Sequence, residues 1–505
     1  MVKRTSQGLM ILCLMVALGK VVPASNNSSL EVDPFGYPLR TVSPTELRRM
    51  LSTGQYQKLN EILQDYQDGV AGDIRREYEV VDAYEALAVA DPSYEKLLGD
   101  WIRATPRAYQ PYLARAFYYY NMGWESRGYK WAKDTNPQQF QLMENYFNQA
   151  LSDLEFVLKT YPRSLVLYDL LIGMSMALGE RETMDWACRK ALAIYPHSFL
   201  IRADYIHALK PRWLGSYREM EAFAAEAQKY IAANPRLAVL KGYVLADQAN
   251  LSRVDGDLEN ALKLYRQALE YGEHSYWYYE VAVTYYKLGR DDQAMAAINK
   301  ALSLRPQDAA YLSFRGLLYY RKGLIERALL DIESARELAT KKSEYRSNAN
   351  EIAYKLLLKG YEYHKAKEYD RAIAEYDLAA RFDPEYGELY YWRARVYVDR
   401  NDLGRALADL ETAVRLAPTH FDSYLLLDWI LARERRWDTI IAYWTRFIEL
   451  QPDNARAYLE RGGAYYHKGD LEAALRDAKK ACELGDEEGC RQYQKLLSQI
   501  GAGQS

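Results

Sequence analysis

The chain has 505 residues, which is the length of three or four domains of roughly 150 residues each, or of one repeat array. Hydrophobic residues make up 49% and charged residues 27%, with 28 Gly and 16 Pro, and this composition excludes a disordered or collagen-like chain. The formal net charge of −3 argues against sequence-independent binding to nucleic acid, which depends on an excess of Lys and Arg.

The N-terminus has the pattern of a secretion signal. Two basic residues precede the apolar run 9–18, and Val22 and Ala24 supply the small residues that a cleavage site requires. This run covers about half of a ~30 Å hydrocarbon core, so we expect no integral membrane span after signal cleavage. We predict a signal peptide over 1–24, an extended mature N-terminus over 25–43, and secretion across an inner membrane into the periplasm. The alternative is an uncleaved signal anchor.

Residues 44–235 are predicted to form an irregular helical region with insertions. Pro162 and Pro196 lie 34 residues apart and frame one helix pair, whereas insertions separate the neighbouring prolines. The region resembles an uncharacterised bacterial domain of unknown function. The resembling segments are Arg115-Ala-Phe-Tyr-Tyr-Tyr, Trp124-Glu-Ser-Arg-Gly and Pro211-Arg-Trp-Leu-Gly-Ser. The resemblance implies no activity, but it favours a bacterial source.

Two insertions in this region allow either a structural or a functional interpretation. The insertion 124–145 has a composition typical of interface anchors. Its distinctive residues are Trp124, Arg127, Trp131 and Lys133. The insertion 211–216 ends at Ser216, which forms a capping box with Glu219 and favours the structural interpretation of that segment.

From residue 236 to residue 484 the sequence repeats every 34 residues. Pro384, Pro418 and Pro452 mark this spacing, and each ends a helix because proline lacks an N–H and disfavours helical geometry in the residue before it. Small residues recur at fixed offsets and allow two helices to approach closely. They include Gly360, Ala372, Ala379, Ala394, Ala406 and Ala413. The glycines at the predicted turn between two helices are Gly289, Gly323 and Gly469.

This layout closely resembles the tetratricopeptide repeat (TPR) family, with its best matches over residues 275–484 and a more irregular block before them. The resemblance implies an all-α fold, an α-solenoid of about ten antiparallel helix pairs that form a TPR superhelix. One repeat, 309–352, is ten residues longer than the others because of the polar stretch 340–349. That stretch is either a longer helix or a hinge.

The end of the array, 485–505, is predicted to contain the end of a hairpin and a capping helix. The segment from Lys479 to Cys490 resembles the helix–loop–helix of Sel1-like repeats, in whose cysteine-rich members two cysteines at this spacing bridge the paired helices. The resemblance implies a disulfide between Cys482 and Cys490, for which export would supply an oxidising environment. The alternative is two buried thiols. Cys188 has no partner at a similar spacing, and we expect it to pack in the core.

Motifs for catalysis are absent from the sequence. It contains no Walker-type phosphate loop, no G-x-S-x-G or H-E-x-x-H motif and no dinucleotide fingerprint. The six histidines show no metal-ligand spacing, and a lone histidine on an inner helix is more often a contact residue than a catalyst. We therefore expect a protein that is not an enzyme and that has no cofactor and no metal site.

By the family layout, the fifth, ninth, twelfth and thirteenth residues of each repeat line the concave channel. In this sequence those positions hold an aromatic residue with a cation beside it in most repeats. Tyr and Trp offer large contact areas with few rotatable bonds, and neighbouring Lys or Arg can hold carboxylates. The alternative is that these tyrosines pack against neighbouring repeats. The predicted groove residues are Tyr120, Tyr279, Tyr286, Lys287, Tyr320, Arg321, Tyr361, His364, Lys365, Tyr391, Arg395, Trp429, Arg433, Tyr466 and His467.

We expect a non-enzymatic, exported TPR scaffold that binds a protein or peptide partner in this groove, within a bacterial envelope complex. The expected ligand is an extended or helical polypeptide with apolar or aromatic anchors and acidic groups. Two alternatives remain: an immunity or inhibitor protein that neutralises a secreted toxin, and a polysaccharide-associated protein, since tyrosine-rich grooves also stack sugars. The family's clamp for chaperone tails needs Lys and Asn at set positions, and this sequence lacks that set.

Overall fold

The computed structural model describes residues 31–39, 43–128 and 134–502. These residues form 25 α-helices and a few short 3₁₀ segments, and their strand pairing is limited to one isolated bridge between Val32 and Pro38. The expected all-α fold with a solenoid architecture is confirmed. None of the described helices is both long enough and apolar enough to cross a membrane.

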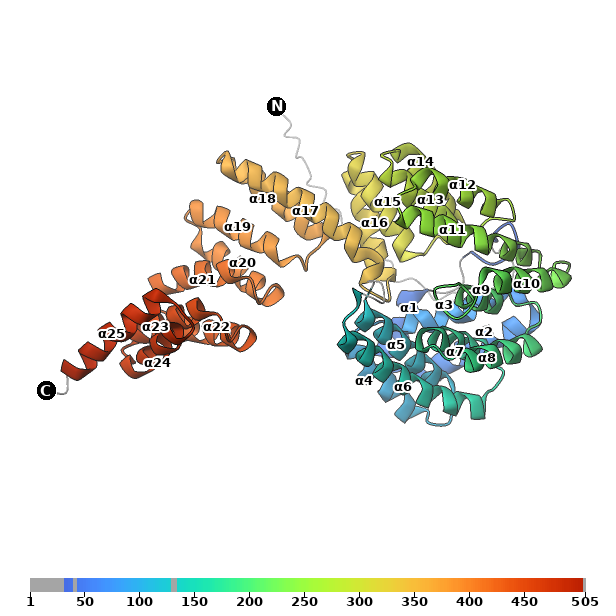
Figure 1. Cartoon of the computed structure of the whole chain (residues 1–505), viewed down its shortest axis with the longest axis horizontal. Coiled ribbons are helices and arrows are strands. Elements are labelled where there is room, and N and C mark those ends of the chain that lie inside the picture. Colours follow the sequence, from blue (N-terminus) through green and yellow to red (C-terminus); the bar gives the residue numbers. More distant parts are fainter. Residues whose placement is uncertain (1–30, 40–42, 129–133, 503–505) are drawn as a thin grey trace, which may run out of the picture.

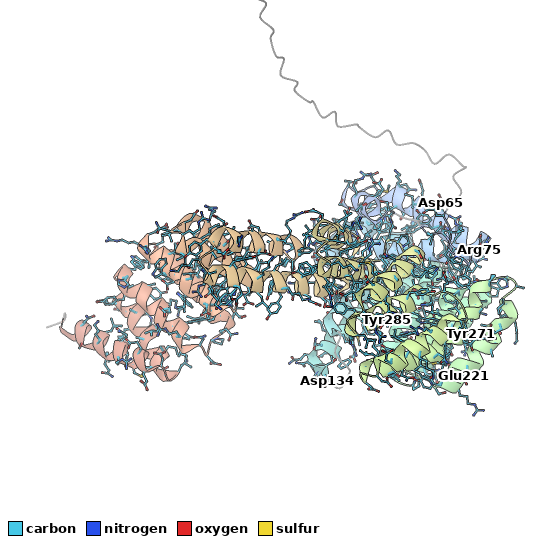
Figure 2. The ribbon with its side chains drawn as sticks, turned by 90° about the horizontal axis from the view of Figure 1, so that it is seen from above. Asp65, Arg75, Asp134, Glu221, Tyr271 and Tyr285 are labelled. Carbon is cyan, nitrogen blue, oxygen red and sulfur yellow. A yellow bond between two sulfur atoms is a disulfide. The ribbon has the colours of Figure 1, made fainter. Side chains whose placement is uncertain are left out.

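The chain is divided into a body, residues 31–342, and an arm, residues 343–502. In Figure 1 the helices of the body, coloured from blue to yellow, wind around once so that the last of them returns to the first. The arm, in orange and red, leads away from this turn to the C-terminus. Figure 2, at right angles to this view, shows the same division. Stacked helix pairs bury their apolar faces between neighbours. One core cluster runs through the body into α19 (Gly387–Asp399), with a second cluster over α19 to α23 (Ala455–Lys468) and a small third one between α24 (Leu471–Glu483) and α25 (Glu487–Ala502).

The body begins with ten helices that fall in the irregular region. Side-chain caps and prolines define many of their starts, as where the Ser198 hydroxyl accepts a hydrogen bond from the Ile201 N–H. Their bounds are α1 Pro44–Ser52, α2 Tyr56–Gly72, α3 Glu77–Leu87, α4 Ser93–Ala104, α5 Gln110–Arg127, α6 Pro137–Thr160, α7 Leu165–Leu178, α8 Arg181–Ile194, α9 Phe199–Ala208 and α10 Tyr217–Ala227. The 3₁₀ segments are η1 Ile74–Arg76, η3 Gln228–Tyr230 and η4 Pro235–Gly242.

Regular helix pairs complete the body and form the arm. In the body they are α11 Tyr243–Val254, α12 Leu258–Leu269, α13 Ser275–Lys287, α14 Asp291–Leu304, α15 Ala309–Arg321 and α16 Ile325–Leu338. The arm comprises α17 Ser343–Lys365, α18 Tyr369–Phe382, α19 Gly387–Asp399, α20 Leu403–Leu416, α21 Phe421–Arg433, α22 Trp437–Leu450, α23 Ala455–Lys468, α24 Leu471–Glu483 and α25 Glu487–Ala502.

The turn between the two helices of a repeat requires one residue in the left-handed region. Gly289 and Gly469 take this conformation, with φ of 71° and 94°, as the sequence predicts. At the equivalent position Lys367, Asn401 and Arg435 adopt φ of 62°, 59° and 56°. A side chain with a β-carbon is strained in this region, so the fold imposes the turn even where the sequence lacks glycine.

A buried ion pair joins the two helices of several repeats, a feature that the sequence analysis missed. Arg393 on α19 donates two hydrogen bonds to the Asp409 carboxylate on α20, at 2.8 and 2.7 Å. Such bidentate geometry satisfies both charges where water is largely excluded. The same 16-residue spacing links Arg315 to Asp331 and Arg461 to Asp477.

The body closes where α1 meets the end of α16, a contact that we call the seam. The Arg48 guanidinium donates a hydrogen bond to the Ala86 carbonyl near the end of α3, at 2.8 Å. It also donates to three carbonyls at the end of α16, at 2.6 to 3.2 Å, those of Glu337, Leu338 and Ala339. The Arg48 guanidinium thus donates hydrogen bonds to two helix C-termini. The last carbonyls of each helix lack partners within the helix and carry partial negative charge.

Two further contacts cross the seam. The Ala90 N–H donates a hydrogen bond to the Thr340 carbonyl at 2.7 Å. The Arg305 guanidinium forms an ion pair with Asp82 on α3 at 3.0 Å. These contacts join the start of the chain to residues more than 200 positions further on.

The polar stretch 340–349 was expected to be either a longer helix or a hinge. Residues 343–349 form the first turns of α17, which begins at Ser343, so this part of the stretch is a longer helix. Residues 339–342 connect α16 to α17 along the seam. The insertion 124–145 extends α5 and α6: Trp124 and Arg127 belong to α5, while Trp131 and Lys133 lie outside the described residues.

Ion pairs join the segment 211–216 and its neighbour Lys210 to α11. The Arg212 and Lys210 cations lie 2.6 and 3.4 Å from the buried Asp247 carboxylate. Ser216 caps α10 by accepting a hydrogen bond from the Glu219 N–H. These contacts support the structural interpretation of this insertion.

The last two helices are linked covalently. Cys482 on α24 and Cys490 on α25 form a disulfide with their Cα atoms 4.4 Å apart, and Gly485 between them has φ of 93°. The predicted pairing is therefore confirmed. Cys188 is a free, buried thiol, and burial raises its pKa to about 12.

Candidate functional site

The predicted groove residues of the arm lie on α17, α19, α21 and α23, the first helices of its four repeats. Tyr361, Arg395 and Trp429 occupy the same position in three successive repeats. Trp429 is 44% exposed, and Tyr466 on α23 is 39% exposed. We call the side chains at these predicted positions, together with the aromatic rings that contact them, the arm row.

Two arginines of the arm row lie on indole rings. The Arg433 guanidinium is 4.6 Å from the centre of the Trp429 ring, and Arg395 is 5.2 Å from that of Trp392. Within the described part of the chain, neither arginine forms an ion pair with a carboxylate, in contrast to the half-buried Arg393 on the same helix as Arg395. The aromatic faces thus hold two cations that can still pair with a carboxylate.

Other members of the arm row make contacts within the chain. His364 Nε2 lies 2.7 Å from the Asp399 carboxylate, which links two neighbouring repeats. Lys365 lies 3.3 Å from the carboxylate of Glu362 on the same helix. The Tyr391 ring is buried and meets His420 edge-on at 4.8 Å.

The C-terminal end of the arm row borders a small pocket. Tyr466 and His467 line a cavity of about 310 Å³ together with Gln492 and Leu496 of α25. The His467 ring stacks on Trp437 with 5.0 Å between ring centres. The disulfide holds α25 beside α24, so that α25 covers this end of the arm row.

Four predicted residues lie where the body joins the arm. The Tyr286 hydroxyl donates a hydrogen bond to Glu351 on α17 at 2.6 Å, and the Arg321 guanidinium lies 4.7 Å from the centre of the Tyr286 ring. Burial, followed by the effect of the Glu351 carboxylate, raises the pKa of Tyr286 to about 12. Tyr320 packs edge-on against α18, and Lys287 is exposed.

The remaining two predicted residues lie inside the body. Tyr120 on α5 stacks on Phe147 of α6 with 5.7 Å between ring centres. Tyr279 on α13 stacks on Tyr311 of α15 at 5.1 Å and lines a cavity described below. The structure therefore distributes the predicted residues over the arm, the junction and the body.

Sequence reasoning missed two exposed apolar residues of α17. Tyr354 and Leu358 are 48% and 44% exposed and lie two turns and one turn, respectively, before Tyr361 on the same helix face. Trp392, which contacts Tyr361 edge-on at 4.8 Å, was missed as well. Tyr354, Leu358 and Tyr361 are spaced by four and then three residues, which is visible in the sequence. The extra length of α17 obscured how Tyr354 and Leu358 relate to the repeat.

A cavity in the body lies beside the seam. We call it the seam cavity. It has a volume of about 560 Å³ and lies between the inner face of α3 and the loops 304–308 and 338–344. The N-terminal segment 33–39 and Trp124 complete its wall.

The described residues contain no group of three or more His, Cys, Asp or Glu side chains arranged to hold a metal ion. The half-buried His274 stacks on Trp277 with 4.5 Å between ring centres, and burial is the main cause that lowers its pKa to about 3. The two surfaces with exposed binding chemistry are the arm row and the seam cavity.

Comparison with protein families identifies two kinds of sequence in the chain. Residues 44–187 match a domain of unknown function (DUF4034). Residues 255–318, 357–421 and 429–488 match the tetratricopeptide repeat.

Several curated proteins share the repeat-containing part. Hsp70-Hsp90 organizing protein 1 of Glycine max is 27% identical over 203 residues, which are 39% of this chain and 34% of that protein. DnaJ homolog subfamily C member 3 of Gallus gallus is 22% identical over 48% of this chain and 44% of its own length. The chain thus spans about a third to less than half of the length of these relatives.

Solved structures that match the chain include the TPR domain of P58(IPK), at 15% identity over 71% of this chain and 94% of that one, with a TM-score of 0.22. A tetratricopeptide repeat protein from Parabacteroides merdae is 19% identical over 64% of this chain and all of its own, with a TM-score of 0.24. The chain combines an N-terminal domain of unknown function (DUF4034) with an array of tetratricopeptide repeats.

Proposed function

We propose that the protein is a non-enzymatic scaffold whose arm row binds a polypeptide segment that carries both apolar and acidic side chains. The observation that carries this proposal is the pair of arginines, Arg395 and Arg433, which lie on indole rings and lack carboxylate partners among the described residues. Beside them Trp429 and Tyr466 expose aromatic surface.

The chemistry of the row supports this choice of ligand. A guanidinium held against an aromatic face is already oriented, so it loses little conformational freedom when it binds a carboxylate with two parallel hydrogen bonds. Trp and Tyr bury large apolar area at low entropic cost and are the residues that most often dominate binding energy. A segment with acidic and apolar residues would use both features at once.

A peptide library tests the proposal directly. The full chain without residues 1–24 would be incubated with displayed random 15-residue peptides, and the bound sequences would be determined. We expect enrichment of peptides that combine Asp or Glu with Leu, Phe or Trp. For the best peptide, the double variant Trp429→Ala with Arg433→Ala should weaken binding by about tenfold or more, as for other interface anchors.

The matched control is a second cation–aromatic pair of the arm that lies off the row. Arg371 on α18 lies 5.6 Å from the centre of the Tyr363 ring, so Tyr363→Ala with Arg371→Ala removes the same chemistry elsewhere. This control should bind the peptide as the unmodified protein does. Equal loss in both variants, or enrichment of peptides without acidic residues, would contradict the proposal.

We further propose that the protein is exported to an oxidising compartment of a bacterial envelope. The signal-like pattern of residues 1–24 supports this location, and so does the Cys482–Cys490 disulfide, because such bonds persist mainly outside the cytosol. The bridge also supports the resemblance of this end to Sel1-like repeats. Sequencing the N-terminus of the protein isolated from its cells tests export: a start at Ser25 is expected, and a start at Met1 would contradict cleavage.

The names of the curated relatives refer to chaperones, and we do not carry that partner over to this chain. The shared part covers 39% of the chain in the plant proteins. At the position that holds Lys365 in the first arm repeat, the following repeats carry Asp399, Arg433 and His467. This set differs from the Lys and Asn set that chaperone-tail binding requires, which favours a different acidic ligand.

A further inference from the structure

The seam cavity is large enough for a small organic molecule. Its volume of about 560 Å³ falls within the ~300–1,000 Å³ that is typical of ligand pockets. It lies where the DUF4034 region meets the repeats, so its wall combines residues from both. Pockets of this size often form where two parts of a chain meet.

Aromatic rings form much of the wall of this cavity. Tyr279 stacks on Tyr311 with 5.1 Å between ring centres and also contacts Tyr276 at 6.2 Å. Tyr78 and Trp124 line the cavity from the DUF4034 side. Tyr276, which also lines the cavity, is 49% exposed. Such rings present negatively polarised faces, which attract cations.

The charged residues of the wall leave an excess of negative charge. Five carboxylates but only three cations line the cavity: Asp33, Asp82, Glu85, Asp308 and Glu344 against Arg236, Arg305 and Lys341. Each cation is already engaged, since Arg236 pairs with Asp33 at 2.9 Å, Arg305 with Asp82 at 3.0 Å, and Lys341 with Glu344 at 3.3 Å. An anionic ligand would therefore find no unpaired cation in this wall.

Among the described residues, the Asp308 carboxylate forms no ion pair, although the charge of Arg305 acts on it. The Asp308 side chain accepts a hydrogen bond from the Tyr311 N–H, as the cap of α15, and Arg305 pairs with Asp82 instead. Glu85 lies 3.9 Å from Lys341, which is closer to Glu344. Burial raises the pKa of Asp308 to about 6. A cation in the cavity would compensate these two carboxylates.

Close enough to Glu85 to feel its charge is a pair of carboxyl groups whose pKa values are raised, by burial first, so that protonation of the pair is favoured. Asp169 on α7 and Asp204 on α9 hydrogen-bond to one another, and Asp169 also feels the charge of Glu85. One oxygen of Asp204 is buried with no hydrogen-bond partner in the described chain. Carboxyl groups at this separation repel one another when both are ionised.

We propose that the seam cavity binds an organic cation, an alkylammonium or guanidinium group with a short apolar body. The charged end would lie between Asp308 and Glu85, and the apolar body would lie against the tyrosine rings. The same group could come from a free amine or from a basic side chain of a peptide. This site is separate from the arm row and does not depend on the function proposed for it.

Titration calorimetry on the full chain without residues 1–24 tests the proposal with two cationic probes and two neutral ones. The cationic probes are cadaverine, a free diamine, and N-acetyl-arginine amide, which imitates a peptide side chain. The neutral analogues are pentanol and N-acetyl-citrulline amide. We expect at least one cationic probe to bind about tenfold or more tightly than its neutral analogue.

The two cationic probes separate the sources of the group. Binding of cadaverine assigns the site to a free amine, and binding of N-acetyl-arginine amide alone assigns it to a peptide side chain; both support the proposal. Binding of neither probe, or equal binding of the charged and neutral members of a pair, would overturn it.

Asp308→Asn is the decisive variant, because asparagine also caps helices and the change removes only the charge. It should weaken binding of the cationic probe about tenfold or more. Its control is Asp257→Asn, the same change at the exposed cap of α12, which should leave binding unchanged. Unaltered binding in Asp308→Asn would refute the assigned position of the cation.

A second variant tests the aromatic wall without touching a charge. Tyr276→Leu keeps an apolar side chain but removes the ring face, and we expect weaker binding of the cationic probe by several-fold. Tyr271→Leu, at the exposed end of the α12 repeat, is its control. If Tyr276→Leu binds the probe as tightly as the control does, the cation does not lie against this wall.

Discussion

Arg48 makes more hydrogen bonds at the seam than any other side chain described above, and we expect Arg48→Met to make the seam open more often. Methionine keeps most of the apolar stem of arginine but donates no hydrogen bond. The change would leave the Ala86 carbonyl and three carbonyls at the end of α16 without their present donor. Because both helix C-termini carry partial negative charge, they would then repel one another across a gap that water must fill.

The magnitude follows from the number and type of these bonds. A hydrogen bond to a charged group contributes about 1.5–3 kcal/mol, but four bonds from one guanidinium share its charge, and its burial carries a desolvation penalty that lowers its pKa. We therefore expect Arg48→Met to reduce the free energy of seam opening by about 2–4 kcal/mol. At 1.4 kcal/mol per factor of ten, this corresponds to roughly 30-fold to roughly 1,000-fold more frequent opening.

Hydrogen exchange of the Ala90 amide measures this opening. That N–H donates to the Thr340 carbonyl across the seam, so it exchanges only when the seam opens. In Arg48→Met its exchange should accelerate by the factor given above, while amides inside the arm helices keep their rates. Because the body and the arm need not unfold together, a local readout is more informative than one melting temperature.

Arg49→Met is the matched control, on the same helix and one residue away. Arg49 pairs with Glu46 at the surface, with side chains 53% and 43% exposed, so its loss should leave the free energy of seam opening almost unchanged. If Ala90 stays protected in Arg48→Met, or if Arg49→Met accelerates its exchange equally, the seam is not held by the guanidinium contacts of Arg48.

Three other predictions concern stability and thiol chemistry. Burial raises the pKa of Asp169 to about 6 and that of Asp204 further, so the protonated forms that stabilise the fold are lost as the pH rises from about 4 through 6. Asp204→Asn should therefore stabilise the body by about 1–2 kcal/mol at pH 8 and by little at pH 4. Denaturant titration at the two pH values measures this difference. Arg435→Gly relieves a left-handed residue and should stabilise the arm by about 1 kcal/mol in the same assay. Alkylation of the denatured, non-reduced protein without residues 1–24 should label only Cys188, and all three cysteines only after reduction.

Each of these expectations has a clear contrary result. A pH-independent gain in Asp204→Asn would mean that relief of carboxyl repulsion is not the cause. No gain in Arg435→Gly would mean that the turn at this position stores no strain. Three labelled cysteines before reduction would show that the bridge between α24 and α25 is absent in solution.

Much of the arm could be predicted from sequence because its information is local. The 34-residue spacing of Pro384, Pro418 and Pro452 fixes the helix ends, and Gly469 fixes the turn between α23 and α24. Each of these residues acts on its own backbone or on a neighbour one helix away. The disulfide is similar, because eight residues separate its two cysteines.

The Arg–Asp pairs inside the repeats were predictable in principle but were missed. Arg393 and Asp409 lie 16 residues apart, and the same spacing recurs in other repeats. A search for aromatic and small residues does not reveal such a polar pattern. The polar stretch 340–349 was left open because helix propensity alone does not decide between a longer helix and a hinge.

The sequence by itself determined the repeat, its helix pairs, its turns and the aromatic and basic character of the arm row, because these depend on residues a few positions or one repeat apart. Only the tertiary structure decided that the body closes upon itself, that Arg48 joins α3 to α16, and that Asp82 and Arg305 meet beside a cavity. A solenoid accumulates a small rotation at every repeat, so contacts between residues more than 200 positions apart depend on the sum of many packing angles. No single segment of the sequence therefore determines these long-range contacts.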